Sequence, residues 1–455
     1  RESLTLDIPA PMLLSVVLRQ VPMVALNQSD SVFGVRKLLP ASKLKRNCHL
    51  LRLAGQFSSC FVARWPHVFS SRSGLIGAAN GLQSKWSIGR QSPVYTIITG
   101  SGFTTNELRL LNAGNVDEAE LLTGGVSVSS KNAVINNLWS QSLVIYAEAQ
   151  KVLDNIGVIS VPVEKASIFV HASIYKAMAT GTLIQFFEKV PLQTTKNAGF
   201  SSRADVIAAT IATLKSTEIY LGTANGFSGL AGNIKYKNTV HALLARFYLM
   251  AGDNDNALVY ANLVDLSSKS TFLYDAVSNN PIAFNAILTP NNYQPIDRNF
   301  GLPTALAPTA LDGRVNFYIT PGSNPTTGAG FFDSNSKLIP LYLPGEITLI
   351  KAEVYARKNL LLEAVIELNK VLTKTAGADA FGVGANLPPY AGTIDQANIL
   401  TEIYRNRCIE LYMSGLKFED SRRFNRPNTE RSRNWYPYPD SERFNNPNTP
   451  ADPVN

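Results

Sequence analysis

A repeated pair of helices constrains this 455-residue chain more than any other feature. Apolar residues at three- and four-residue steps predict helices over Tyr236–Ala251 and Asp253–Leu266, and again over Glu346–Arg357 and Leu360–Thr373. The second pair matches the first after a shift of 107 residues, as from Ala245 to Ala352. Small residues let antiparallel helices approach closely and an aromatic ring fills the space beside them, which favours tetratricopeptide hairpins over chance similarity between amphipathic helices. The matched residues are Ala245 with Ala352, Tyr248 with Tyr355, and Ala257 with Ala364.

Further helices make the chain mostly α. Long apolar periodicities cover Asn136–Ile156, Ala166–Phe187 and Ser202–Tyr220, with Ser202 or Ser201 as an N-cap. A last helix over Asn398–Ser414 ends at Gly415. Two shorter helices are expected near Gly74–Lys85 and Thr105–Ala113.

Two segments of this predicted helical body, residues 73–455, have no clear periodicity. Ser267–Pro344 is rich in Pro, Asn and Gly, and a loop of this length inside a compact domain is usually functional. The tail Arg422–Asn455 is rich in Pro, Asn and aromatic residues, and we expect it to lack regular structure. We therefore expect a loop-rich ligand-side insertion over about 267–344 and a C-terminal strap over 422–455.

Residues 1–72 form an arm whose structure the sequence leaves open between strands, extended chain and helices. They hold ten Lys or Arg and three Asp or Glu, so the remaining chain carries only +1 of the total charge of +8. A neutral body argues against nucleic-acid binding. The basic arm either contacts acidic lipid or another subunit, or is a solvated surface.

The cysteines define neither a metal site nor a disulfide framework. Cys48 and Cys60 can form one bridge, and Cys408 falls in a helical pattern where we expect it to be buried. No run of 18 apolar residues predicts a membrane-spanning helix.

The C-terminal sequence resembles the signature of the SusD/RagB family of nutrient-binding outer-membrane proteins. The stretch from Glu402 to Phe424 follows its pattern of Arg, Glu-Leu, Gly, aromatic, Asp and Arg, although Ser421 replaces the usual Leu. Trp435–Asn448 resembles the family's closing Pro- and Asn-rich segment, and the helices that begin near Leu138 and Ile174 resemble two of its helices. The resemblance covers about residues 130–450. The matching residues are Arg407, Glu410, Leu411, Gly415, Phe418, Asp420, Arg423, Pro437, Pro439 and Glu442.

The resemblance implies a SusD-like tetratricopeptide fold and a non-catalytic protein that captures oligosaccharide or peptide at the cell surface. It also implies a SusC-like, TonB-dependent outer-membrane barrel as the partner. Family members begin at a lipidated cysteine, but neither Cys48 nor Cys60 has the small apolar lead-in of a lipoprotein signal, so the anchor is in doubt.

The signature residues also have a structural interpretation. Arg407 and Glu410 lie three apart on one helical face and are placed to pair. Asp420 and Arg423 are placed to hold the tail through charged hydrogen bonds. Prolines pre-set the tail as an extended strap across the helices. We therefore interpret the signature as scaffold.

The sequence offers little catalytic chemistry. The histidines, among them His171 and His241, lack a second ligand at metal spacing, and neither a G-x-S-x-G elbow nor a phosphate loop occurs. Glu107, Glu118 and Glu120 could form acid–base pairs, but nothing confines them to a cleft. We predict no enzyme activity, no cofactor and no metal.

Sugar binding needs flat aromatic rings for the sugar face and polar side chains for its edges. We expect such residues in two non-helical stretches, one after the first helix and one in the long insertion, with packing onto the body as the alternative for each ring. The candidate ligand-binding residues are Trp86, Arg90, Tyr95, Tyr293, Arg314, Phe317 and Tyr318.

Two other functions compete with nutrient capture. Residues 1–72 could add a strand to a neighbouring copy or wrap it, which would make the protein a subunit of an extracellular filament or surface layer built on a SusD-like body. A general tetratricopeptide scaffold for peptide partners fits the long Pro- and Asn-rich loops less well.

Overall fold

The computed structural model describes residues 68–283, 292–324 and 326–453. Most of the predicted basic arm, including Cys48 and Cys60, lies outside the described residues. Within them, no helix is long and apolar enough to cross a membrane.

The first helices differ in part from the prediction. α3 (Arg72–Ser87) confirms the helix expected near Gly74–Lys85. The helix expected over Thr105–Ala113 is wrong, because the chain is helical earlier, in α4 (Pro93–Thr104), and residues 108–110 form strand β1 instead. Ser92 caps α4 by accepting from the Tyr95 N–H at 3.3 Å, and Pro93 occupies its first turn. β1 pairs antiparallel with β5 (Tyr293–Pro295), and α5 (Val116–Thr123) follows β1.

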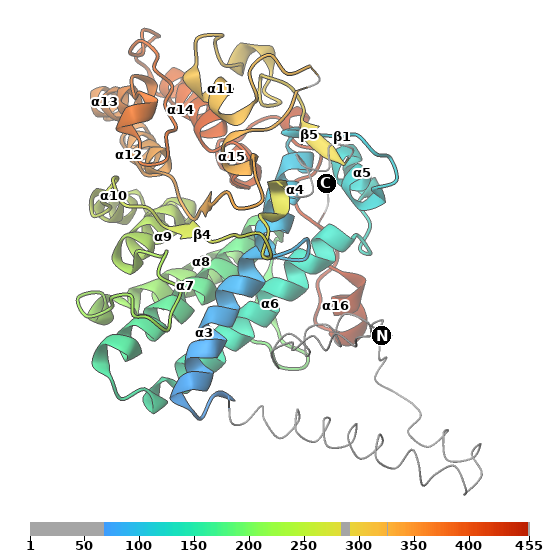
Figure 1. The fold of residues 1–455 in the computed structure, drawn as a ribbon. Helices are drawn as coiled ribbons and strands as arrows, with labels where there is room; N and C mark the ends of the chain where they lie inside the picture. The colour runs from blue at the N-terminus through green and yellow to red at the C-terminus, as the bar shows by residue number, and fades with distance from the viewer. Residues whose placement is uncertain (1–67, 284–291, 325, 454–455) are drawn as a thin grey trace, which may run out of the picture. The chain divides into compact units, whose positions relative to one another are not determined.

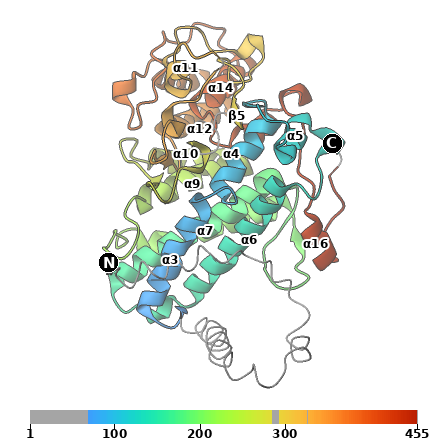
Figure 2. The same ribbon diagram turned by 45° about the vertical axis from the view of Figure 1, so that its right-hand side comes forward.

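Three long helices form the body beside α3. α6 (Ala133–Asp154) lies against α3 and α7 (Pro162–Phe186), as Figures 1 and 2 both show. α7 is buried along almost its whole length, so it is the central helix of this layer. α8 (Arg203–Lys215) packs on α7, and Ser202 is its N-cap, as predicted.

The two predicted hairpins are confirmed as α9 (Tyr236–Ala251) with α10 (Asn254–Asn262), and α12 (Pro344–Arg357) with α13 (Leu361–Leu372). The repeat extends to the hydrogen bonds of the turns. Asp253 N–H donates to Tyr248 C=O and Leu360 N–H donates to Tyr355 C=O, both at 2.9 Å. Gly252 and Asn359, which match in the repeat, both have left-handed backbone with φ of 78° and 59°.

The insertion between the hairpins is irregular, as predicted. Its regular pieces are short: β4 (Thr271–Phe272) pairs with β6 (Ile339–Pro340), and α11 (Gly313–Tyr318) has only 6 residues. α11 lies against α14 (Gln396–Glu410), the helix of the signature.

The signature continues through a tight turn into α15 (Lys417–Arg423). Gly415 has φ of +85°, and a Cβ there would lie 2.1 Å from the Ile97 side chain on α4. The signature glycine is therefore required by the close approach of α4 to this turn.

The tail runs across the body as a strap, but the expectation that it lacks regular structure is wrong. It forms the 3₁₀ turn η9 (Asn428–Glu430) and the short helix α16 (Asp440–Asn445). Tyr436 and Tyr438 are buried, and Tyr438 packs against Trp139 of α6 at 5.8 Å between ring centroids. The Trp139 indole N–H donates to Glu442 at 3.1 Å, so a signature residue of the strap is fixed to the central helices.

Candidate functional site

The predicted ligand-binding residues gather at two places. Arg90, Tyr95 and Tyr293 meet beside α5, although they come from the α3–α4 loop, α4 and β5. Arg314, Phe317 and Tyr318 lie on α11 against the signature helix. Trp86 belongs to neither group, because it lies on α3 and its side chain is buried in the core.

The first group is built around a carboxylate. Arg90 Nη2 donates to Glu118 Oε1 at 3.0 Å, and the Tyr95 hydroxyl lies 3.5 Å from the same oxygen. The Arg90 guanidinium carbon lies 5.5 Å from the centroid of the Tyr95 ring, which is a cation–π contact. The Tyr293 ring meets the Tyr95 ring edge-on at 6.4 Å.

This group lies at the surface, and Arg90 is its only member with a substantially exposed side chain. The Arg90 side chain is 50% exposed and that of Glu118 5%. Burial raises the pKa of Tyr95 and of Tyr293, so both phenols stay protonated donors at neutral pH. The Tyr293 hydroxyl is buried and has no hydrogen-bond partner of normal geometry among the described residues. A buried donor of this kind is expected where a ligand or water completes a site.

Glu118 is the member of the group that the sequence did not assign to ligand binding. The acid–base pairing considered for Glu107, Glu118 and Glu120 has no support, because each has different partners. Glu107 is buried and accepts from the Met413 N–H at 3.2 Å, whereas Glu120 accepts from Asn132 at 3.0 Å.

The second group is part of the scaffold. Arg314 is fully buried and donates to Asp312 at 2.7 Å, to Asn406 at 2.8 Å and to the signature residue Glu410 at 3.2 Å. Lys374 also binds Glu410, at 2.6 Å. The predicted pairing of Arg407 with Glu410 is therefore wrong, because Glu410 is already neutralised by cations from α11 and from the segment after α13.

The aromatic residues of α11 are packed rather than offered to a ligand. Tyr318 is buried and donates to the Glu410 carbonyl at 2.6 Å. Phe317 is partly buried, with its ring centroid 4.9 Å from that of Tyr318 and 5.2 Å from that of Phe331.

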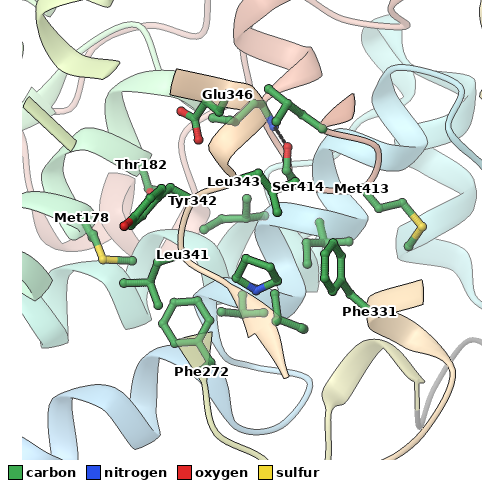
Figure 3. A pocket seen from close by; sticks show the side chains of 18 of the residues that line it. Met178, Thr182, Phe272, Phe331, Leu341, Tyr342, Leu343, Glu346, Met413 and Ser414 are labelled. Carbon is green, nitrogen blue, oxygen red and sulfur yellow. Dashed lines mark hydrogen bonds between the residues drawn. The ribbon is translucent and has the colours of Figure 1, made fainter. Parts of the chain in front are cut away.

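Trp86 lines a cavity of about 100 Å³ between α4, α7, α9 and the segments around 341 and 413. Figure 3 shows Phe272, Leu341 and Phe331 around this space, with Glu346 at its rim. The Glu346 carboxylate takes two hydrogen bonds from Arg246, at 2.6 and 2.7 Å, so its charge is compensated. An apolar cavity of roughly 150 Å³ holds one benzene, so this space is too small for a sugar ring.

His171 and His241 lie on buried helix faces, as predicted. His171 Nε2 lies 3.1 Å from the Ala79 carbonyl oxygen, and burial lowers the pKa of His171 to about 4. Cys408 is buried, as predicted, and it is not in a disulfide. Among residues 68–283, 292–324 and 326–453, no three His, Cys, Asp or Glu side chains are grouped to hold a metal ion.

The architecture defines a class of protein: stacked helical hairpins with a long irregular insertion and a C-terminal strap. Neither a protein-family model nor a curated protein matches the sequence. Solved structures do match, and they show that the chain has the SusD-like fold.

Three of these structures illustrate the likeness. A SusD superfamily protein from Bacteroides thetaiotaomicron has a TM-score of 0.66 at 15% identity, over 84% of this chain and 100% of that one. A SusD superfamily protein from Bacteroides fragilis has a TM-score of 0.64 at 14% identity, over 84% and 99%. A SusD-like carbohydrate binding protein from Bacteroides vulgatus has a TM-score of 0.61 at 17% identity, over 81% and 86%. The SusD-like helical fold predicted from the C-terminal motif is thus confirmed.

Proposed function

We propose that this protein is a non-catalytic binding protein that captures oligosaccharide at the cell surface for a TonB-dependent outer-membrane transporter. The observation that carries the proposal is the likeness of the fold, over 81% of the chain, to a protein described as SusD-like and carbohydrate binding. The transporter follows from the family resemblance of the C-terminal motif.

The Arg90–Glu118–Tyr95–Tyr293 group is the proposed sugar site. A guanidinium and a buried carboxylate are complementary to the hydroxyl groups on a sugar's edge. The Tyr95 ring lies under the Arg90 side chain, so a ligand that displaces this half-exposed side chain uncovers a ring for the apolar face of a sugar. The buried Tyr293 hydroxyl, which has no hydrogen-bond partner of normal geometry among the described residues, supplies a further donor at the same place.

Calorimetric titration of the full chain with a panel of neutral and acidic oligosaccharides tests the site. Arg90→Gln and Glu118→Gln should each weaken sugar binding at least tenfold while circular dichroism remains unchanged. The matched control is Arg72→Gln, because Arg72 and Glu164 form the same kind of surface pair, with side chains 55% and 13% exposed. Sugar binding that persists in both site variants would reject this site, and the absence of binding to every sugar of the panel would reject the function.

The transporter is tested separately, by gentle isolation of the protein from its native membrane followed by mass spectrometry and electron microscopy. A large β-barrel protein in equal amount supports nutrient capture. A repeating array of this chain alone would instead support the assembly hypothesis.

A further inference from the structure

Two adjoining hollows open beside the second hairpin, the signature helix and the start of the strap, and the larger one also reaches the turn of the first hairpin at Gly252. Their volumes are 270 and 540 Å³, and both are lined by Arg357, Leu400 and Arg423. Arg426 and Thr401 are among the other residues that line the smaller one. A water occupies roughly 30 Å³ of liquid, so the smaller hollow is large enough for a polyatomic ion together with some of its hydration water.

The charges around these hollows do not balance. Four arginines share three carboxylates, so one positive charge remains without a carboxylate. The arginines are Arg357, Arg407, Arg423 and Arg426, and the carboxylates are those of Glu353, Asp420 and Glu430. Close by, Arg203 and Arg422 share the single carboxylate of Glu419.

The carboxylates lie beneath the arginines, whereas the arginine side chains reach the hollows. Glu353 and Glu430 are 0% and 4% exposed, but Arg357 and Arg426 are 29% and 22% exposed. Arg357 uses Nε for Glu353 and Nη2 for the Arg423 carbonyl. Arg426 uses Nε and Nη2 for Glu430. Each therefore keeps Nη1 without a hydrogen-bond partner among the described residues.

Burial of positive charge in this group is incompletely compensated. Burial, with neighbouring Arg407 adding to it, lowers the pKa of Arg357. Burial also lowers the pKa of Arg423, whose Nε is buried without a hydrogen-bond partner. An anion in the hollow would offset both effects, since a guanidinium binds the oxygens of phosphate, sulfate and carboxylate with charge-assisted hydrogen bonds.

We propose that the smaller hollow binds a compact oxyanion (a phosphate, sulfate or carboxylate group) between Arg357 and Arg426. This site is separate from the proposed sugar site, so it stands whether or not that site binds sugar. The anion is either a free inorganic ion or an acidic group carried by a sugar.

Thr401→Glu tests the site without removing any arginine. Thr401 is an exposed position on α14 that lines the hollow, so the new carboxylate competes with an anion while the ion pairs beneath stay intact. Thr401→Gln is the control of the same size without charge. Arg357→Gln gives an independent test. Arg298→Gln is its control, because Arg298 is a partly exposed arginine that does not line the hollows and donates to Asn316 at 2.6 Å.

The measurement is ³¹P line broadening of inorganic phosphate by the full chain at constant ionic strength, with sulfate, glucuronate and glucose as competitors. We expect saturable phosphate binding that Thr401→Glu and Arg357→Gln weaken at least tenfold and that the two controls preserve. Displacement by sulfate but not by glucuronate assigns the site to a free ion, and displacement by glucuronate assigns it to an acidic sugar, with glucose inert in both cases. The absence of saturable phosphate binding, or equal binding by Thr401→Glu and Thr401→Gln, would overturn the proposal.

Discussion

Arg407 and Asp420 form a buried, two-point ion pair between the signature helix α14 and α15. Arg407 Nε donates to Asp420 Oδ2 at 2.8 Å and Nη2 donates to Oδ1 at 3.1 Å, with both side chains at most 5% exposed. Asp420 also binds Arg423, which continues to Glu353 on α12. The signature thus joins the last helices to the second hairpin.

Asp420→Asn should lower the free energy of unfolding by about 3–5 kcal/mol, because it leaves buried guanidinium charge without its partner. Denaturant titration measures the loss. Arg72→Gln, which breaks an exposed pair, should cost no more than about 1 kcal/mol. A loss of unfolding free energy below about 1 kcal/mol for Asp420→Asn would show that the Arg407–Asp420 pair contributes little to stability.

Tyr436 gives a graded test of the strap. Its ring packs against Phe186 and Phe418 with centroids 5.3 and 5.5 Å away, and its hydroxyl lies 2.9 Å from Thr104 Oγ1. Tyr436→Ala should cost about 3–5 kcal/mol of unfolding free energy, and Tyr436→Phe about 1 kcal/mol.

Phe444, also in the strap but 81% exposed, is the control for Tyr436. Phe444→Ala should change the unfolding free energy by less than about 0.5 kcal/mol. Equal effects of the two alanine variants would mean that the strap is not packed as described.

The matched turns of the two hairpins predict the effect of exchanging their residues. Gly252 is left-handed and a Cβ there would meet nothing within 4 Å, so only backbone strain opposes a side chain. Gly252→Ala should cost about 1–2 kcal/mol. Gly252→Asn should cost clearly less, because Asn359 occupies the same position of the repeat with φ of 59°. Thermal unfolding of both variants checks this prediction. If Gly252→Ala were the less destabilising of the two, the position would require a small residue and not one that tolerates left-handed backbone.

Because His171 is buried, we expect the folded protein to lose stability in acid. Its pKa is lowered to about 4 by burial, from an ordinary 6.5, so the unfolded chain binds a proton at a pH where the folded protein does not. Its contribution is complete above pH 6.5 and falls by about 3 kcal/mol as the pH drops toward 4.

Urea unfolding at several pH values checks this prediction. The difference in slope between the natural protein and His171→Asn isolates His171 from His241, whose pKa is also lowered by burial and which acts in the same direction. Parallel pH profiles for the two proteins would contradict the prediction.

The helices that face the core on only one side could be predicted from sequence. In such a helix apolar residues face the core and polar residues face solvent, so apolar residues recur with a period of 3.6. α13 is such a helix, and Ser202 and Gly252 mark the ends of two others. α4 could not be found this way, since nearly all of its 12 residues are buried and the period disappears over so short a helix, whereas the largely buried α7 is 25 residues long. The Ser92–Pro93 start signal was its only local mark.

Contacts between residues far apart in the chain could not be predicted from sequence for a different reason. The rule that residues three apart pair on a helix favoured Glu410 for Arg407, but the turn at Gly415 brings Asp420 closer to the guanidinium. The meeting of Arg90, Tyr95 and Tyr293 likewise depends on the pairing of β1 with β5, which no local pattern specifies. The composition of these segments therefore indicated ligand chemistry, but not which rings would be buried.

The strap also determines when folding can be completed. Tyr436 meets Thr104 across 332 residues of sequence, and Tyr438 meets Lys189 across 249. During synthesis the central helices emerge long before these tyrosines. Phe186 and Phe187, at the end of α7, therefore stay exposed to solvent until the last residues of the chain have been synthesised. A chain shortened by proteolysis or early termination near its end would therefore lose a closing element of its core, and the cell would have to keep the unfinished chain from aggregating until translation ends.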